Sequence, residues 1–299
     1  MKSVVNIFRH IYRHPLNSNR RSKAIIEFLR WQLGARLLGR RAEIRWVNDS
    51  RFLVGIGESG LTGNIYVGLM EYADMAFLIH AIRPSETFVD VGANAGAYTI
   101  LASKVAKVRA IAFEPIPSTA DKLVDQIHLN RIEDLVVVKN KGVAERKGIL
   151  HFTTEHDTMN RVSLDEDNET TATVAVTSLD DELDPDARYF LKIDVEGFEH
   201  KVLEGAERLF ASNRVSAIII ELNGSGEKYG YSNDAVHGKL LAFGFRPVAY
   251  EPRNRLLTPL ASYNETSDNT LYVKDLADVV ERCRSAPQHV IHTADGITI

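Results

Sequence analysis

The stretch FVDVGANAGAYT, residues 88–99, decides the fold. A short apolar run ends at Asp90, a loop of small residues follows, and a helical pattern begins at Ala97. Gly92 and Gly96 permit a tight turn and let a ligand approach the backbone. Such a strand-to-helix turn lies at the carboxyl edge of a parallel sheet, where α/β folds bind nucleotides. The stretch therefore predicts an α/β fold with a ligand site at this turn.

The chain beyond this turn alternates between strands and helices. Five short apolar runs predict strands at residues 87–91, 108–113, 135–138, 189–193 and 215–221. Amphipathic segments predict helices at residues 97–105, 118–129, 199–210 and 234–243. Two more strands are expected at residues 245–250 and 270–273, separated by a loop that contains Pro and Asn. This alternation predicts a doubly wound, mainly parallel sheet of seven strands with helices on both faces.

The acidic residue in the first turn selects among nucleotide ligands. Asp90 would repel a pyrophosphate but suits an ammonium group, and D-x-G-x-N-x-G differs from the G-x-G-x-x-G of NAD-binding turns. Glu114 ends the next strand, 22 positions beyond Gly92, and suits the two hydroxyls of a ribose. Together these features indicate S-adenosylmethionine as the cofactor. An NAD-linked oxidoreductase on a similar sheet is the first alternative.

Three carboxylates lie at the ends of the fourth and fifth strands. Asp194 and Glu196 follow the fourth strand, whereas Glu221 ends the fifth and precedes Asn223. Gathering like charges raises their pKa values, which is costly in a purely structural role. We expect general-base catalysis by Asp194, with Glu196 and His200 as the next candidates. The alternatives are helix capping and a divalent metal bound by these oxygen ligands, although no metal is expected.

Several motifs occur in a fixed order between about residues 68 and 273. They are DVGANAG (90–96), FEP (113–115), HLN (128–130), TSLDD (177–181) and KIDVEGFE (192–199), with Ile220-Glu221 after them. In this combination the sequence resembles the FkbM-type S-adenosylmethionine-dependent methyltransferases. The resemblance implies a class I, Rossmann-like methyltransferase fold. It also implies O-methylation of a small molecule, most often a sugar or a glycosylated or lipid-linked product.

The resemblance also assigns residues to the cofactor and the acceptor. It implies that the methionine end is lined by Asp90, Gly92, Asn94 and Gly96, together with Ala93 and Tyr98 of the same stretch. It further implies that Glu114 holds the ribose, that Glu71 is the glutamate before the first strand, and that Asn140 begins the adenine-side segment. For the acceptor we expect contacts from Tyr66, Tyr72, Asn160, Glu221 and Asn223.

The net charge of −4 hides a basic head on an acidic body. Residues 1–45 contain eleven Lys and Arg against Glu27 and Glu43, a net charge of +9, which leaves −13 for the remainder. Apolar spacing predicts a helix whose packing stripe consists of Ile25, Phe28, Leu29, Gln32, Leu33 and Leu37. The head is either a helical extension packed on the domain or a basic surface that contacts an anionic membrane. A non-catalytic cofactor-binding protein that docks through this head is the second functional alternative.

The chain divides into four predicted parts. These are the basic extension (1–45), a pre-core segment with a helix (46–83), the cofactor-binding domain (84–275) and a C-terminal tail (276–299). Residues 149–186 form an acidic insertion in which 149–153 and 173–177 look like paired strands. The rest of this insertion is either a solvated loop or a lid over the active site.

Composition limits the compartment and the partners. Cys283 is the only cysteine, which excludes an internal disulfide and favours a reducing compartment. No apolar run is long enough to span a bilayer, and the first residues lack a secretory pattern. We therefore expect a cytoplasmic protein with a small-molecule or glycan acceptor. The acidic reaction side disfavours a nucleic-acid partner.

Overall fold

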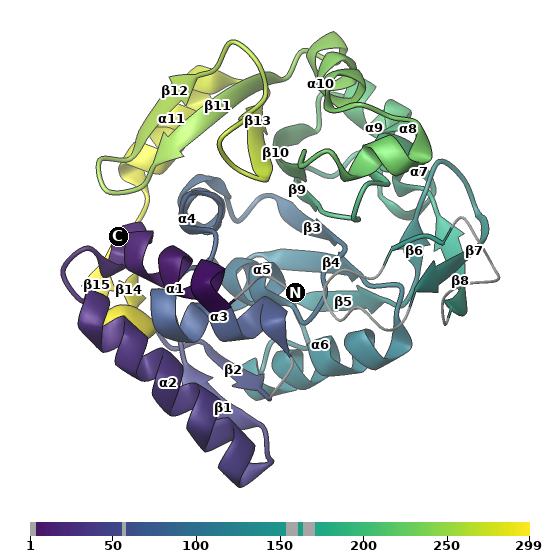
Figure 1. Cartoon of the computed structure of the whole chain (residues 1–299). Coiled ribbons are helices and arrows are strands. Elements are labelled where there is room, and N and C mark those ends of the chain that lie inside the picture. Colours follow the sequence, from purple (N-terminus) through teal and green to yellow (C-terminus); the bar gives the residue numbers. More distant parts are fainter. Residues whose placement is uncertain (1–3, 56–57, 154–160, 164–170) are drawn as a thin grey trace.

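A computed structural model describes residues 4–55, 58–153, 161–163 and 171–299 of the chain. A central eight-stranded sheet has the order β12-β11-β13-β10-β9-β3-β4-β5 (Figure 1). Its strands are β3 (Thr87–Val91), β4 (Arg109–Phe113), β5 (Val136–Lys139), β9 (Tyr189–Ile193), β10 (Val215–Glu221), β11 (Arg246–Glu251), β12 (Leu256–Pro259) and β13 (Asn269–Val273). The five strands from β5 to β10 are parallel, and β13 runs antiparallel to β10. The predicted doubly wound α/β fold of the Rossmann-like class is confirmed.

The sheet has one strand more than the seven predicted. β12 occupies the segment expected to be a loop and pairs antiparallel with β11 at the sheet edge. Its sequence LLTP is short and ends in Pro259, which lacks a backbone donor. An edge strand needs a partner on one side only and therefore tolerates proline. For this reason the segment forms a strand without a strong strand pattern.

Helices cover both faces of the sheet. One core includes side chains of α4 (Tyr72–Ala81), α5 (Ala97–Ile100) with its π-helical continuation Leu101–Val105, α6 (Pro117–Asn130) and α11 (Leu276–Ser285). The other core includes α7 (Leu179–Glu182), α8 (Glu199–Glu204), α9 (Glu207–Ala211) and α10 (Asn233–Ala242). The single helix predicted over residues 199–210 is therefore two. Gly205 separates them, and a Cβ there would lie 2.2 Å from the carbonyl oxygen of Ala144.

The N-terminal part packs beside this sheet and contains a short hairpin. It comprises α1 (Val4–Arg13), a 3-10 turn (Pro15–Asn17), α2 (Arg21–Leu38), β1 (Ala42–Arg45), β2 (Arg51–Val54) and α3 (Ser59–Val67). α1 and α2 bury Ile11, Ala24 and Phe28 against Tyr66 and Val67 of α3. The buried guanidinium of Arg20 forms ion pairs with Glu27 and Asp295. No helix in the described parts of the chain has the length and apolarity needed to cross a bilayer.

The predicted packing stripe of α2 is partly wrong. Phe28 is buried as expected, but the side chains of Leu29, Leu33 and Leu37 are exposed, and Ala24 and Ala35 take the buried positions. The periodicity identified an apolar helix correctly. It did not identify which side of that helix faces the protein, because apolar residues lie on both sides.

The insertion contributes β7 (Gly148–Thr153) and β8 (Thr171–Thr177) to a small sheet, which is completed by β6 (Gly142–Val143) from the preceding segment. β7 and β8 pair antiparallel, which confirms the predicted strand pair. Residues 154–160 and 164–170 of the segment predicted to be a loop or lid, Asn160 among them, lie outside the described residues. The C-terminal segment adds β14 (Val290–Ile291), a 3-10 turn (His292–Ala294) and β15 (Ile297–Thr298).

Candidate active site

The glycine loop after β3 is built by tight backbone packing. Gly92 and Gly96 have φ of +82° and +87°, in the left-handed region that favours glycine. A Cβ on Gly92 would lie 1.8 Å from the carbonyl oxygen of Asp194, and one on Gly96 would lie 2.4 Å from Leu123 Cδ1. The protein's own atoms therefore fill the space beside these glycines. The lack of a side chain at these two positions therefore serves the packing of the loop against Asp194 and Leu123.

The backbone amides of the loop are already used. All five amides of residues 92–96 donate to acceptors within the protein. The first two donate to the carbonyl oxygen of Phe113 at 3.0 and 2.9 Å, and that of Asn94 donates to the Glu114 carboxylate at 2.9 Å. A ligand at this loop would meet side chains and carbonyl oxygens instead of a ring of free amides. That arrangement is poorly suited to a pyrophosphate.

Glu114 joins the loops that follow three adjacent strands. Its second carboxylate oxygen accepts the amide of Ile116 at 3.0 Å, and its carbonyl oxygen accepts the side chain of Asn140 at 2.8 Å. Burial raises the pKa of Glu114 to about 7, although the two backbone amides oppose the shift. Glu114 and Asn140 thus lie together at the ends of β4 and β5.

Asp90 lies beneath the loop. It is fully buried and accepts a hydrogen bond of 2.7 Å from the Thr99 hydroxyl of α5. In the sheet it is the register partner of Lys192 on β9. Burial raises the pKa of Asp90, and the ammonium of Lys192 counters that shift. The interactions of Asp90 are therefore internal, with Thr99 and Lys192.

Lys192 is a site residue that the sequence reasoning missed. Its buried ammonium lies 2.6 Å from the Asp194 carboxylate and 4.8 Å from the centre of the Tyr98 ring, and the Tyr98 hydroxyl donates to Glu71. Burial disfavours the charge of Lys192, but nearby carboxylates outweigh burial and raise its pKa. The available signal was a single lysine in the otherwise apolar strand YFLKI. The Lys192 ammonium is thus surrounded by Glu71, Asp90, Tyr98 and Asp194.

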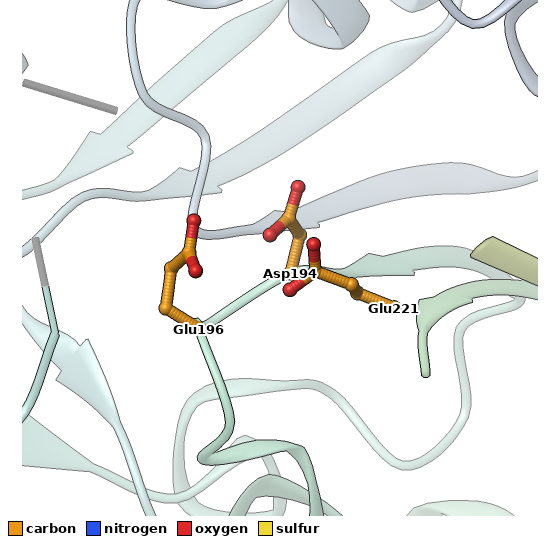
Figure 2. Close-up of side chains that lie close together, drawn as sticks. All are labelled: Asp194, Glu196 and Glu221. Carbon is orange, nitrogen blue, oxygen red and sulfur yellow. The ribbon is translucent and has the colours of Figure 1, made fainter. Parts of the chain in front are cut away.

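Three carboxylates form the centre of the site (Figure 2). One oxygen each from Asp194, Glu196 and Glu221 lies within 4.8 Å of the others. Glu196 has φ of +55°, an uncommon conformation for a residue with a side chain. Strained backbone of this kind is concentrated at functional sites. The three predicted residues are therefore brought together, and one of them carries local strain.

A buried glutamate holds the strained segment in place. Glu199 accepts the backbone amides of Val195 and Gly197 at 3.0 and 3.1 Å. Gly197 follows Glu196 with φ of +102°, and a Cβ there would lie 2.5 Å from the carbonyl oxygen of Ser225. Glu199 ends the motif KIDVEGFE, but the sequence analysis assigns it no role. Its position two residues beyond Gly197 does not reveal that its carboxylate accepts these backbone amides.

The carboxylates differ in their protonation. Burial first, and the neighbouring charge of Asp194 second, raise the pKa of Glu196 to about 7. Burial and three nearby carboxylates raise the pKa of Glu221 much further, so this group is protonated at neutral pH. One oxygen of Glu221 is buried and receives no hydrogen bond from the described residues. The site therefore combines a carboxyl group paired with lysine, one that titrates near neutrality and one that is neutral.

The family is decided by a match over more than half of the chain. Residues 90–247, which contain the glycine loop and all three carboxylates, match the methyltransferase FkbM domain. The chain belongs to the FkbM methyltransferase family. The predicted resemblance is confirmed, and the protein is an S-adenosylmethionine-dependent methyltransferase.

Solved structures resemble this FkbM methyltransferase only distantly. M. jannaschii TYW2 in complex with AdoMet is 16% identical, with 78% of this chain and 83% of that chain covered at a TM-score of 0.39. Precorrin-6y C5,15-methyltransferase from Geobacter metallireducens is 12% identical, with 68% and 85% covered at a TM-score of 0.38. A transferase from Pyrococcus horikoshii is 14% identical, with 83% and 81% covered at a TM-score of 0.43. No curated protein matches the sequence.

Two of the predicted site residues, His200 and Tyr66, form ring contacts with other parts of the protein. His200 stacks on Tyr231 at 4.1 Å between ring centres, and its Nδ1 lies 3.4 Å from Glu204. Tyr66 packs edge-on against Phe28 beneath the N-terminal helices. These contacts place the His200 ring and the Tyr66 ring in packing positions.

Tyr72 and Asn223, which were expected to contact the acceptor, also interact with other groups. Tyr72 lines a crevice with Arg253 and Arg255 instead of facing the carboxylates. The Asn223 amide oxygen accepts the backbone amide of Ser225 at 2.8 Å and so shapes the loop after β10. Sequence spacing placed Asn223 near the site but did not show that its oxygen is occupied by the loop itself.

Proposed function

We propose that this methyltransferase methylates a hydroxyl oxygen of a small acceptor, a sugar or a glycosylated or lipid-linked product. The observation that carries the proposal is the cluster of Asp194, Glu196 and Glu221 at the same sheet edge as the glycine loop. Carboxylates bind sugar hydroxyls through hydrogen bonds, and an ionised one can take the proton that the acceptor loses.

The charge of the site suits the cofactor. Glu71, Asp90 and Asp194 lie around Lys192, the buried cation of the site. An acidic environment favours the ammonium and sulfonium groups of S-adenosylmethionine and disfavours the phosphates of NAD. Glu114 would hold the ribose hydroxyls, while Glu71 and Asp194 would face the methionine end. When bound, the cofactor supplies a methyl group already activated by a positively charged sulfur.

An apolar cavity beside the loop suits the adenine side. It is lined by Phe113 and Val143 with Val195 and Phe198, next to Gly92. Its volume of about 20 Å³ corresponds to a single water-sized group. We infer that a purine enters here only when side chains of the β6–β8 sheet move outward.

Glu196 and Asp194 have different roles toward the acceptor in this proposal. A hydroxyl is a weak nucleophile at neutral pH, so its proton must leave as it attacks. Glu196 is the better base because its pKa of about 7 matches the operating pH. Asp194 already accepts a hydrogen bond from the Lys192 ammonium at 2.6 Å, so one of its oxygens is occupied and we assign it the part of an orienting acceptor. This order reverses the sequence-based preference for Asp194 over Glu196.

Glu221 has a different part in the proposal. As a protonated carboxyl it donates one hydrogen bond, which would orient an acceptor oxygen beside Asp194. Positioning of this kind contributes strongly to catalysis of methyl transfer. Holding two reacting groups in the correct orientation can lower the activation free energy by up to about 7–11 kcal/mol.

The test compares two isosteric variants with the wild-type enzyme. S-adenosylmethionine labelled in the methyl group is incubated with a panel of methyl hexosides and deoxyhexosides, and alkali-stable label in the sugar is measured. Glu196→Gln should lower kcat by about 10²–10⁴-fold with S-adenosylhomocysteine binding unchanged. Asp194→Asn should raise KM for the acceptor as well. Full transfer by Glu196→Gln would remove Glu196 as the base, and alkali-labile label would indicate an ester instead of an ether.

The same assay addresses the metal alternative. Three carboxylate oxygens within 4.8 Å of one another would also suit a divalent cation. We propose metal-free catalysis because Lys192 already supplies a positive charge at Asp194. Dialysis against EDTA should therefore leave methyl transfer unchanged, whereas a loss restored by Mg²⁺ or Ca²⁺ would favour the metal.

A further inference from the structure

Helix α2 carries a row of exposed apolar side chains. Ile26, Leu29, Leu33 and Leu37 expose 47, 45, 64 and 86% of their surface. The opposite side of the helix already packs against the protein, since Ala24, Phe28 and Ala35 are buried there. An apolar row of this length on one helix is costly in water unless something covers it.

Helix geometry places the row opposite the packed face. At 100° per residue, Leu29, Leu33 and Leu37 fall within one quarter of the helix circumference, roughly half a turn from Ala24 and Phe28. Arg30 falls on one flank of the row and Arg36 on the other. Figure 1 shows the C-terminal end of α2 reaching beyond the central sheet, next to β1. The row therefore faces outward with basic residues on both sides.

The arginines beside the row differ from those that anchor the helix. Arg20 and Lys23 form ion pairs with Asp295, and Arg41 forms one with Glu58. Arg30, Arg36 and Arg40 are exposed and form no ion pair with any residue that the structure describes. Their positive charge is available to an outside partner.

We propose that this face of α2 docks on an anionic membrane surface. The apolar side chains would enter the boundary between headgroups and acyl chains, and the flanking arginines would remain at the phosphates. The positive charges of Arg30, Arg36 and Arg40 complement such a surface. A second copy of this chain fits less well, because a two-fold interface would bring the same arginines of both copies together.

The test is flotation of the full-length protein with lipid vesicles at 150 mM NaCl. Vesicles of phosphatidylcholine with 30% phosphatidylglycerol are compared with vesicles of phosphatidylcholine alone. We expect binding to the anionic vesicles, weaker binding to the neutral ones, and further weakening at 500 mM NaCl. Leu33→Ser/Leu37→Ser and Arg30→Glu/Arg36→Glu should each lower the partition coefficient on anionic vesicles at least tenfold.

Matched controls change similar residues elsewhere. Leu241→Ser/Leu256→Ser alters two leucines that are 44 and 57% exposed on other elements, and should leave binding unchanged. Arg146→Glu/Arg188→Glu makes the same charge change on the exposed surface of the body, and should lower binding less than twofold.

Three results would overturn the proposal. The first is no binding to anionic vesicles at 50 mM NaCl. The second is an equal loss of binding in the control and α2 variants. The third is a dimer in light scattering that Leu33→Ser/Leu37→Ser dissociates, with no vesicle binding, because the row would then be an interface between copies.

Discussion

The carboxyl edge of the sheet and the outer face of α2 use charge in opposite ways. At the edge, the ammonium of Lys192 is buried among Asp90, Asp194 and Glu71. On α2, Arg30 and Arg36 lie exposed beside leucines and form no ion pair with any residue that the structure describes. The charges of the edge are fixed by other parts of the protein, whereas those of α2 are available to a partner. Sequence composition alone does not distinguish a charge that is paired inside the protein from an exposed charge that can bind a partner.

The largest expected difference between the two regions is the loss of folding stability when one positive charge is removed. Lys192→Met removes the positive charge from buried carboxylates and should lower the free energy of unfolding by about 3–5 kcal/mol. Arg30→Met removes an exposed cation and should change it by less than about 0.5 kcal/mol. Urea unfolding of both variants measures these values. Similar losses would mean that Arg30 is also held by the fold.

Two glycines with positive φ extend the comparison to the backbone. Gly92→Ala would bring a Cβ 1.8 Å from the Asp194 carbonyl oxygen, whereas Gly39→Ala at the end of α2 meets no atom within 4 Å. We expect Gly39→Ala to cost about 1 kcal/mol from φ alone, and Gly92→Ala about 2–4 kcal/mol because overpacking is added. Thermal and urea unfolding give both numbers, and equal costs would contradict the packing account.

Much of the fold was predictable because its strands are buried on both faces. β9 and β10 have the bounds expected from their apolar runs, since a buried parallel strand admits few polar residues. β12 was missed because an edge strand does not need such a run. The break between α8 and α9 was missed because it depends on Gly205 approaching a distant loop.

The site was predictable where residues follow strands directly. Asp194, Glu196 and Glu221 come together because the ends of parallel strands meet at one edge. Lys192 and Glu199 act through hydrogen bonds to neighbours that no spacing rule reveals. Leu29, Leu33 and Leu37 were assigned to the packed face because helical periodicity reports a stripe and not its partner.

The two regions should also differ in their response to pH. The pKa of Glu196 is raised to about 7, and the base is active when deprotonated, so kcat/KM should rise with pH through about 7 and then level off. At pH 6 it should be about tenfold below the plateau. Glu196→Gln should remove this rise. Arginine does not titrate in this range, so vesicle binding should be equal at pH 6 and pH 8.

The smallest effect is expected from the exposed leucines in the absence of membranes. Leu33→Ser and Leu37→Ser should each change the free energy of unfolding by less than about 0.5 kcal/mol, because these side chains are already in water. Urea unfolding without vesicles measures this. A loss of several kcal/mol would show that the row packs against the protein in solution.

Ligand binding to the wild-type protein tests the central claim most directly. Titration calorimetry with S-adenosylhomocysteine and, separately, with NAD measures which ligand the carboxyl edge accepts. The account predicts binding of S-adenosylhomocysteine, equally in wild type and Glu196→Gln, and no binding of NAD. Binding of NAD without binding of S-adenosylhomocysteine would contradict it.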